Sequence, residues 1–320
     1  NFHIYLCFGQ SNMEGCGPIE VQDTMDISNR FLMMAAVDMP QLGRVRGEWY
    51  RAVPPLTVPY GGLSPADYFG RTMLENLPQE GRVGIINVAV GGCKIELFDE
   101  DVCSDYLKDQ PDWLKQKARD YDNHPYQRLI TLARQAQKEG VIKGILLHQG
   151  ESNTGDKEWP HKVKKVYDRM LVDLGLSAEE VPLLAGEVIH ASQQGACASM
   201  NEIIATLPEV IPTAHVISSD GCASSSDKLH FTSEGYRMLG RRYAHTLPCH
   251  NYRKQNGTYR NPILYADVPD MSVCFDGSHY YMVSTTMHLM PGAPIMRSAD
   301  MQHWETVSYL YPRIDDGDRY

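Results

Sequence analysis

The sequence contains no long hydrophobic run and no excess of positive charge. Its best apolar segment, residues 83–90, has the length of a strand and falls far short of the ~18 residues that a membrane-spanning helix needs. Lysine and arginine number 30, against 40 aspartates and glutamates. The formal net charge of −10 disfavours nucleic acid or an anionic lipid surface as the main partner.

The sequence shows no metal-binding cysteine pattern, and we expect that any leader segment has been removed. The eight cysteines include no C-x-x-C pair, and no four Cys or His residues follow zinc-finger spacing, so we expect no structural zinc site. The chain begins at Asn1 and enters an apolar run at once, as a processed mature protein or an artificially shortened one would. What is present is the composition of a folded protein, with 42% hydrophobic and 22% charged residues. The length of 320 residues predicts about two domains.

Short apolar runs alternate with amphipathic stretches over the first 247 residues. This alternation is typical of βαβ units whose parallel sheet is covered on both faces. We expect strands at residues 2–8, 82–90, 144–148, 181–189 and 214–219. We expect helices at residues 66–77, 126–139, 158–174, 196–207 and 233–247. The sequence therefore predicts an α/β fold, a three-layer α/β/α sandwich with a parallel sheet.

Two long insertions, at about residues 16–62 and 93–123, interrupt this pattern. Long connections in a compact domain are usually functional rims or disorder. The second insertion carries Trp113, Tyr106 and several acids, so we interpret it as a wall of the binding cleft. A surface elaboration without ligand contact is the alternative. The lysines within residues 162–165 are interpreted as a solvated helix face.

The character of the sequence changes after residue 247. A polar, turn-rich stretch at 251–261 is expected to link a first domain, 1–250, to a second, 262–320. Short strand patterns without helical periodicity follow at 271–275, 280–285, 295–298 and 306–310. They predict one antiparallel sheet of about four strands. Because such a sheet lacks a second layer, it either packs on the first domain or belongs to something larger.

Three predicted strands of the first domain end in polar or glycine-rich segments. These are G-Q-S-N at 9–12, the glycine pair at 91–92 and H-Q-G-E-S-N at 148–153. The carboxyl ends of parallel strands meet at one edge of a sheet, where open α/β folds bind ligands. Glycines at such an edge free backbone N–H groups that can stabilise an oxyanion.

A fourth segment supplies an acid and a base. Asp227 and His230 lie three residues apart before the last predicted helix, so one turn can hold them side by side. A serine hydroxyl becomes a nucleophile when an imidazole accepts its proton and a carboxylate orients that imidazole. Taken alone, Ser11 could be a helix cap and His230 a surface histidine. Together with the three strand ends, they predict a serine hydrolase.

These segments, in this order, resemble the SGNH hydrolase superfamily over residues 1–247, and specifically its branch of sialate O-acetylesterases and carbohydrate esterase family 6. The resemblance implies a flavodoxin-like sandwich and a two-step acyl transfer that needs no cofactor or metal. It makes Ser11 the nucleophile and places Asp227 and His230 as acid and base.

The same resemblance implies an oxyanion hole. Two of its donors are the backbone N–H groups of Ser11 and Gly92, and the third is a side-chain amide. This branch has Gln-Gly-Glu where the wider superfamily has Gly-x-Asn-Asp, so we assign the amide to Gln149. Gln10 and Glu151 are expected in supporting roles.

The second domain resembles the opening of glycoside hydrolase family 43, whose members are five-bladed β-propellers acting on xylan- and arabinan-type chains. The resemblance is carried by N-P-I-L at 261–264, D-V-P-D-M-S-V at 267–273, Y-Y-M-V-S-T at 280–285, M-R-S-A-D at 296–300 and W-E at 304–305. It maps the general base of that family to Asp270, while the other acids of the family lie further along. Since the segment amounts to a first blade, we expect Asp270 to be a site remnant.

These resemblances imply a secreted or periplasmic bacterial esterase that removes acetyl groups from xylan or xylo-oligosaccharides, at the start of a longer bifunctional esterase/glycosidase. Acetyl groups block the glycosidase, so placing both activities on one chain raises the effective concentration of the second. Trp49, Tyr60 and Trp113 are candidate sugar-stacking residues, with core or rim packing as the alternative. Three other functions stay open: a sialate O-acetylesterase, an inactive carbohydrate-binding module, and a thiol enzyme that uses Cys93 beside Gly92.

Overall fold

The computed structural model describes residues 1–75, 77–247, 272–284, 292–298 and 304–311. The chain divides into two compact units, Asn1–Tyr252 and Arg253–Tyr320. The linker expected at 251–261 and the site remnant expected at Asp270 lie outside the described residues.

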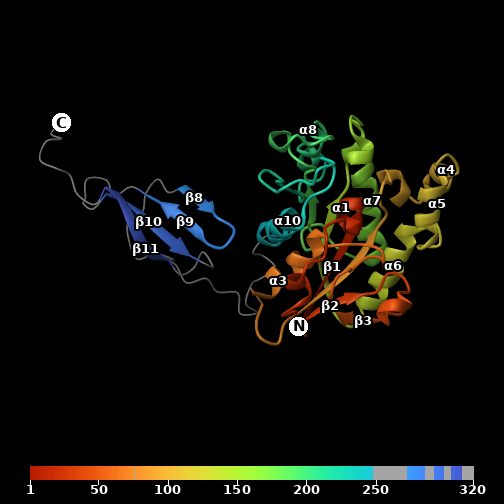
Figure 1. Cartoon of the computed structure of the whole chain (residues 1–320), viewed down its shortest axis with the longest axis horizontal. Helices are drawn as coiled ribbons and strands as arrows, with labels where there is room; N and C mark the ends of the chain where they lie inside the picture. Colours follow the sequence, from red (N-terminus) through yellow and green to blue (C-terminus); the bar gives the residue numbers. More distant parts are fainter. Residues whose placement is uncertain (76, 248–271, 285–291, 299–303, 312–320) are drawn as a thin grey trace, which may run out of the picture. The chain divides into compact units, whose positions relative to one another are not determined.

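A seven-stranded sheet forms the centre of the first unit, in the order β3-β2-β4-β1-β5-β6-β7 (Figure 1). Its strands are β1 (Phe2–Gly9), β2 (Phe31–Met34), β3 (Trp49–Arg51), β4 (Arg82–Ala89), β5 (Val141–His148), β6 (Leu183–Gly186) and β7 (His215–Ile217). Neighbouring strands are parallel except β3, which runs antiparallel to β2. The predicted parallel sheet is therefore confirmed, with one antiparallel edge strand added.

The central strands bring the polar segments together. β1 is buried at every residue and β4 at every residue but Arg82, which is the pattern of a parallel sheet covered on both faces. β1 lies between β4 and β5, so Gly9 at its end has Ala89 on one side and His148 on the other. The segments that follow these three residues therefore emerge side by side at the carboxyl edge of the sheet.

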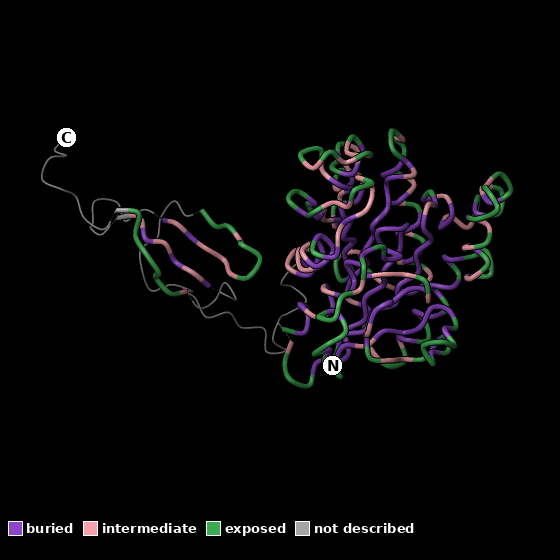
Figure 2. The backbone as a smooth tube through the Cα atoms, viewed as in Figure 1, coloured by how far each residue is buried: buried purple, intermediate pink, exposed green. Residues whose placement is uncertain are grey.

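Helices cover both faces of this sheet, which confirms the three-layer sandwich. On one face α3 (Pro65–Glu75) packs on α10 (Ser233–Thr246), and on the other α6 (Pro125–Ala136) packs on α7 (Trp159–Leu174) (Figure 1). Gly240 permits the first of these contacts, because a Cβ there would lie 2.4 Å from the carbonyl oxygen of Pro65. Figure 2 shows the buried residues concentrated on the strands and the exposed residues along the loops.

Short helices occupy the connections. The α-helices are α1 (Ser11–Glu14), α2 (Val21–Thr24), α4 (Cys103–Lys108), α5 (Asp112–Arg119), α8 (Met200–Ile204) and α9 (Leu207–Val210). The 3-10 helices are η1 (Pro40–Leu42), η2 (Ile95–Phe98), η3 (Glu151–Asn153) and η4 (Ala191–Gln193). Those in the second insertion, η2, α4 and α5, build up one end of the carboxyl edge.

Two expectations differ from the structure. The insertion at 16–62 is not only a rim, because it adds β2 and β3 to the sheet; strands of four and three residues are too short to show an alternating pattern. The helix expected at 196–207 is replaced by α8 and α9. Its first residues are held in a turn instead, since the Ala196 N–H donates to the carbonyl of Lys228.

The second unit is a four-stranded antiparallel sheet in the order β11-β10-β9-β8. Its strands are β8 (Ser272–Phe275), β9 (Tyr280–Val283), β10 (Gly292–Ser298) and β11 (Glu305–Tyr311). Met282, Pro294 and Met296 are buried in this sheet, whereas Val273 and Leu310 are exposed. A thinly covered antiparallel sheet of this kind agrees with the start of a propeller.

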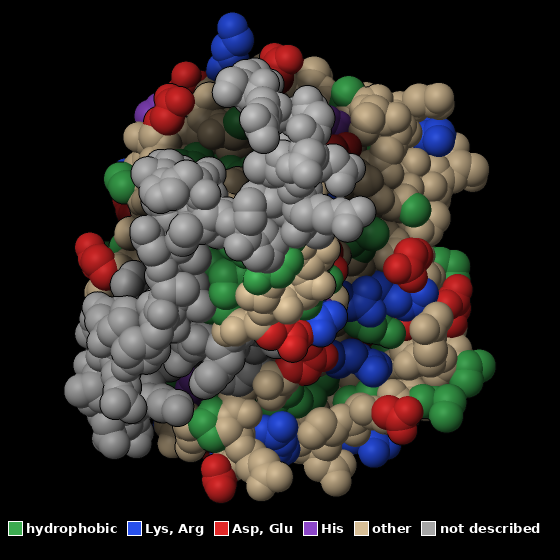
Figure 3. Space-filling view, turned by 90° about the vertical axis from the view of Figure 1, so that its left-hand side faces the viewer, with side chains coloured by type: hydrophobic (Ala, Val, Ile, Leu, Met, Phe, Trp, Pro, Cys, Tyr) green, Lys and Arg blue, Asp and Glu red, His purple; other side chains and the backbone are tan. Residues whose placement is uncertain are grey.

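Both signs of charge share the face drawn in Figure 3. Lysine and arginine side chains lie among aspartates and glutamates there, outside the grey atoms. The net negative charge is thus not gathered into one patch on this face.

Within the ranges that the structure describes, every helix is too short or too polar to cross a membrane.

Candidate active site

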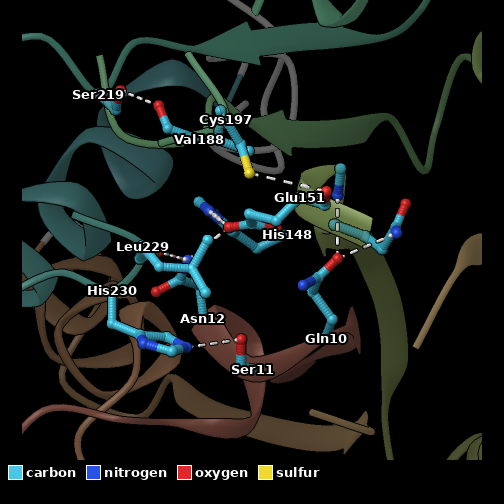
Figure 4. A network of polar contacts seen from close by, with 12 residues as sticks. Gln10, Ser11, Asn12, His148, Glu151, Val188, Cys197, Ser219, Leu229 and His230 are labelled. Carbon is cyan, nitrogen blue, oxygen red and sulfur yellow. Dashed lines mark hydrogen bonds and ion pairs between the residues drawn. The ribbon is translucent and has the colours of Figure 1, made fainter. Parts of the chain in front are cut away.

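Ser11, His230 and Asp227 meet at the carboxyl edge of the sheet. Ser11 begins α1 directly after β1, and its Oγ lies 2.9 Å from His230 Nε2 (Figure 4). On the other side of the ring, His230 Nδ1 lies 2.7 Å from Asp227 Oδ2. The structure therefore aligns the carboxylate of Asp227 and the imidazole of His230 with a hydroxyl that lies more than 200 positions earlier in the chain. In this alignment the imidazole can accept the proton of the Ser11 hydroxyl.

The loop before α10 holds Asp227 as a charged acceptor. Asp227 Oδ1 accepts hydrogen bonds from the backbone N–H groups of Leu229 at 2.9 Å and His230 at 3.0 Å, and from Ser225 Oγ at 2.5 Å. Burial acts to raise the pKa of Asp227, but these bonds and the one with His230 outweigh it and hold the pKa well below its ordinary value. Because the carboxylate accepts from Nδ1, the neutral His230 ring leaves Nε2 free to act as a base.

Asn12 ties the nucleophile segment to the histidine loop. Its buried Nδ2 donates to the carbonyl of Leu229 at 3.1 Å and to Glu151 Oε1 at 2.5 Å, and Figure 4 shows it between these two residues. Tyr236 donates to Asn12 Oδ1 at 2.5 Å, which fixes the orientation of the amide. Burial raises the pKa of Glu151. Asn12 thus links the carboxylate of Glu151 to the loop that carries His230.

A pocket of about 350 Å³ opens beside Ser11. This volume lies at the small end of ligand pockets, which span roughly 300–1,000 Å³. Its walls come from the three polar strand ends, from α5 and from the histidine loop. The lining residues are Gln10, Ser11, Glu14, Cys16, Gly91, Gly92, Trp113, Lys117, Glu151, Ser152, Leu229 and His230.

The glycine pair is required by the crowding of this pocket. Gly92 has a φ of +82°, and a Cβ on it would lie 2.4 Å from the ring of Trp113. A Cβ on Gly91 would lie 2.6 Å from Lys117 Nζ and 2.7 Å from Glu14 Oε2. The Gly91 N–H donates to Glu14 Oε1 at 2.9 Å, whereas the Gly92 N–H has no acceptor among the described residues. The Gly92 N–H is therefore available to a ligand, as is that of Ser11.

The second insertion forms one wall of the pocket through α5. Trp113 and Lys117 lie four residues apart on this helix and so share a face, a spacing that the sequence already contained. Lys117 Nζ lies 2.6 Å from Glu14 Oε2 and 5.4 Å from the centre of the Tyr60 ring. Sequence reasoning missed Glu14 and Lys117, while Tyr60 lies next to Lys117 but outside the pocket lining.

Gln149 does not present its amide to the pocket, contrary to expectation. Its Nε2 donates to Asn153 Oδ1 at 2.8 Å, to Gln10 Oε1 at 3.1 Å and to the carbonyl of Cys93 at 3.3 Å. Trp159 Nε1 donates to its Oε1 at 2.5 Å, and because an indole N–H is only a donor, this bond fixes which end of the amide is which. The N–H groups of Gln149 are thus used inside the protein.

Two other candidates also lie away from the pocket. Trp49, in β3, packs edge-on against Phe2 with ring centroids 4.9 Å apart, at the amino-terminal end of the strands, and it donates to Glu139 at 3.1 Å. Its ring is part of the packing of the sheet, not a sugar-stacking surface at this site. Cys93 is fully buried with its Sγ against the carbonyl of Gly9, and burial raises the pKa of its thiol well above the ordinary value. Such a thiol is a poor nucleophile.

Comparison with known families gives two matches along the chain. Residues 1–248 match the model of the family described as carbohydrate esterase, sialic acid-specific acetylesterase, and residues 259–316 match glycosyl hydrolases family 43. A beta-xylosidase of Formosa agariphila is 40% identical over 65 residues, which are 20% of this chain and 11% of that protein. The chain spans about a tenth of the length of the curated relatives it matches.

Solved structures share the fold at low sequence identity. A protein from Arabidopsis thaliana is 19% identical with a TM-score of 0.58, over 76% of this chain and 96% of that one. A carbohydrate acetylesterase from Xanthomonas citri is 17% identical with a TM-score of 0.54, over 95% of this chain and 68% of that one. The family resemblance predicted from the motifs is confirmed by the family matches. Since one family model spans residues 1–248 of 320, the chain belongs to the carbohydrate esterase family of sialic acid-specific acetylesterases.

Proposed function

We propose that this protein is a serine esterase that removes O-acetyl groups from xylan or xylo-oligosaccharides. The observation that carries the proposal is the alignment of Asp227, His230 and Ser11, with contacts of 2.7 and 2.9 Å, at the mouth of a pocket. Membership of a carbohydrate esterase family supports ester hydrolysis on a sugar. The family 43 match on the same chain supports a xylan-type substrate.

In the proposed reaction, Ser11 Oγ bonds to the acetyl carbonyl carbon while its proton passes to His230 Nε2. The carbonyl oxygen takes the electron pair of the broken π bond and faces the N–H groups of Ser11 and Gly92. The bond to the sugar oxygen then breaks, and His230 returns the proton to that oxygen. Water attacks the acetyl-Ser11 ester with His230 again as base, which releases acetate and restores the hydroxyl.

The charge of the pocket favours a neutral sugar. Lys117 is the sole lysine or arginine among the residues that line this pocket, and its ammonium is paired with the buried carboxylate of Glu14. A sialic acid carries a carboxylate, which proteins usually bind with an unpaired arginine or lysine. A xylose unit carries hydroxyl groups, which the oxygens of Glu14 and the ammonium of Lys117 can both bind. Sialate is thus the second candidate, supported by the name of the family.

The family 43 match at residues 259–316 supports a wider arrangement. We propose that this chain is the amino-terminal part of a bifunctional enzyme in which a glycosidase follows the esterase. It would act in the periplasm or the medium of a bacterium, because polymeric xylan is too large to enter the cytoplasm. Deacetylation by the first domain would then expose the chain to the second at high effective concentration.

Acetate release is the experiment that tests the function. Acetylated xylo-oligosaccharides and O-acetylated sialic acid would be compared, with the Ser11→Ala protein as the blank for each. We expect release from both to require Ser11, and kcat/KM to be higher for the xylo-oligosaccharides. A higher value for sialic acid would keep the esterase but change its substrate. A folded protein that releases acetate from neither would refute the esterase and leave a binding module.

Trp113→Ala is expected to raise KM for acetylated xylo-oligosaccharides about 2- to 12-fold with little change in kcat. The ring of Trp113 lines the pocket and is 55% exposed, and an aromatic contact of this kind contributes about 0.5–1.5 kcal/mol. Steady-state kinetics measure both constants. The matched control is Tyr60→Ala, which removes an aromatic side chain that is equally exposed but lies outside the lining. An unchanged KM in Trp113→Ala would contradict the role of this ring in binding.

A further inference from the structure

The side-chain oxygen of Gln10 is anchored by donors from the segment after β5. Gln10 Oε1 accepts from Gln149 Nε2 at 3.1 Å, from the Ser152 N–H at 3.2 Å and from the Gly150 N–H at 3.4 Å. Gln10 itself is 2% exposed, so this amide has little freedom. Because all three partners can only donate here, they determine which end of the amide is the oxygen.

The nitrogen of the same amide is left facing the pocket. Gln10 lines the pocket, and its Nε2 has no acceptor in the part of the chain that the structure describes. Figure 4 shows this nitrogen on the side of Ser11, turned away from the donors that hold the oxygen. A confined amide N–H without an acceptor is unfavourable unless a ligand or water accepts from it.

We propose that Gln10, and not Gln149, supplies the side-chain donor of the oxyanion hole. This inference rests on the proposed esterase function and assigns a further catalytic residue to it. The oxyanion then accepts from Gln10 Nε2 and from the backbone N–H groups of Ser11 and Gly92. Gln149 is a positioning residue, because its contact with the reacting oxygen runs through Gln10 Oε1.

The segment after β5 then orients two donors without touching the substrate oxygen itself. Its residues 149, 150 and 152 hold the oxygen of Gln10, and Ser152 Oγ donates to the carbonyl of Gly92 at 3.0 Å. Both donors are thereby held in place before the substrate binds. A preorganised donor of this kind acts mainly on the transition state, where the charge on the oxygen is greatest.

The variant Gln10→Glu distinguishes the role of Gln10 Oε1, which accepts three hydrogen bonds, from that of Gln10 Nε2, which donates to the oxyanion. One carboxylate oxygen can keep the three bonds that Oε1 accepts, while the other replaces Nε2 by a charged acceptor that repels the oxyanion. We expect kcat to fall about 10²–10³-fold, as for the loss of one oxyanion donor, with KM within about threefold and no loss of thermal stability. The hydrolysis of p-nitrophenyl acetate measures these constants independently of the natural sugar.

Gln10→Ala and Gln149→Leu complete the test. We expect Gln10→Ala to lower kcat as well. We expect Gln149→Leu to lower kcat less than Gln10→Glu does, provided that circular dichroism shows the variant to be folded. A Gln10→Glu protein with the kcat of the wild type overturns the inference. Gln10 would then serve only to bond the segment after β5 through its oxygen, and not to donate to the oxyanion. A wild type with no Ser11-dependent esterase activity would instead refute the proposed function, and the inference with it.

Discussion

Ser11→Ala is expected to lower kcat for acetate release about 10⁴- to 10⁶-fold while leaving the fold intact. The variant removes the one oxygen that His230 can activate, since Nε2 contacts Ser11 Oγ at 2.9 Å. Loss of the nucleophile alone removes nearly all the catalysis that a triad provides. The fold should survive, because the Ser11 side chain lies at the pocket and its hydroxyl has no other contact in the described residues.

The measurement is acetate release at saturating substrate, with thermal unfolding as the test of the fold. Ser177→Ala is a matched control, because this exposed hydroxyl donates to Glu179 and is not among the residues that line the pocket, and it should retain full activity. Activity that survives in Ser11→Ala would rule out the serine mechanism. If that residual activity were lost in Cys93→Ala, the reaction would be assigned to the thiol instead.

Asp227→Asn is expected to lower kcat about 10⁴-fold although it changes a single polar atom. Three groups donate to Asp227 Oδ1, and in the variant they would bond the oxygen of the amide and so hold it at the same position. These donors belong to Ser225, Leu229 and His230. The amide nitrogen must then face His230 Nδ1 and donate to it. This reverses the polarity of that bond, so the ring carries its proton on Nε2 and points it at Ser11. In that tautomer His230 cannot accept the serine proton.

Steady-state kinetics of Asp227→Asn check this prediction, and the loss should appear in kcat with KM nearly unchanged. Thermal stability should change little, because the turn keeps its three bonds to the amide oxygen. Asp220→Asn provides the comparison, since Asp220 is an exposed acid that bonds Ser192 outside the pocket. An Asp227→Asn protein whose kcat lies within tenfold of that of the wild type would show that the carboxylate does not set the tautomer of His230.

Much of the fold could be predicted because it depends on local patterns. Buried parallel strands must be apolar over most of their length, so β1 and β4 are visible as continuous runs. The four strands of the second unit could also be predicted locally, because they are short β patterns separated by turns such as that at Gly277. Strand β2 and the edge strand β3 were not visible, because strands of four and three residues are too short to carry a pattern of their own; β2 is placed by its pairing with β4, and β3 by its pairing with β2.

The sequence by itself determined where the reactive groups lie along the chain. Ser11 follows the first strand, and Asp227 and His230 share one turn, so strand order and a spacing of three residues suffice to predict that they can meet. Only the tertiary structure decided which way each amide points. Gln10 and Gln149 are the same residue type at neighbouring strand ends, but Trp159 turns the oxygen of one inward and Gln149 turns the nitrogen of the other toward the pocket. Gln149 and Gln10 lie 139 residues apart in the sequence, and the direction of a side chain depends on which donors and acceptors surround it after folding.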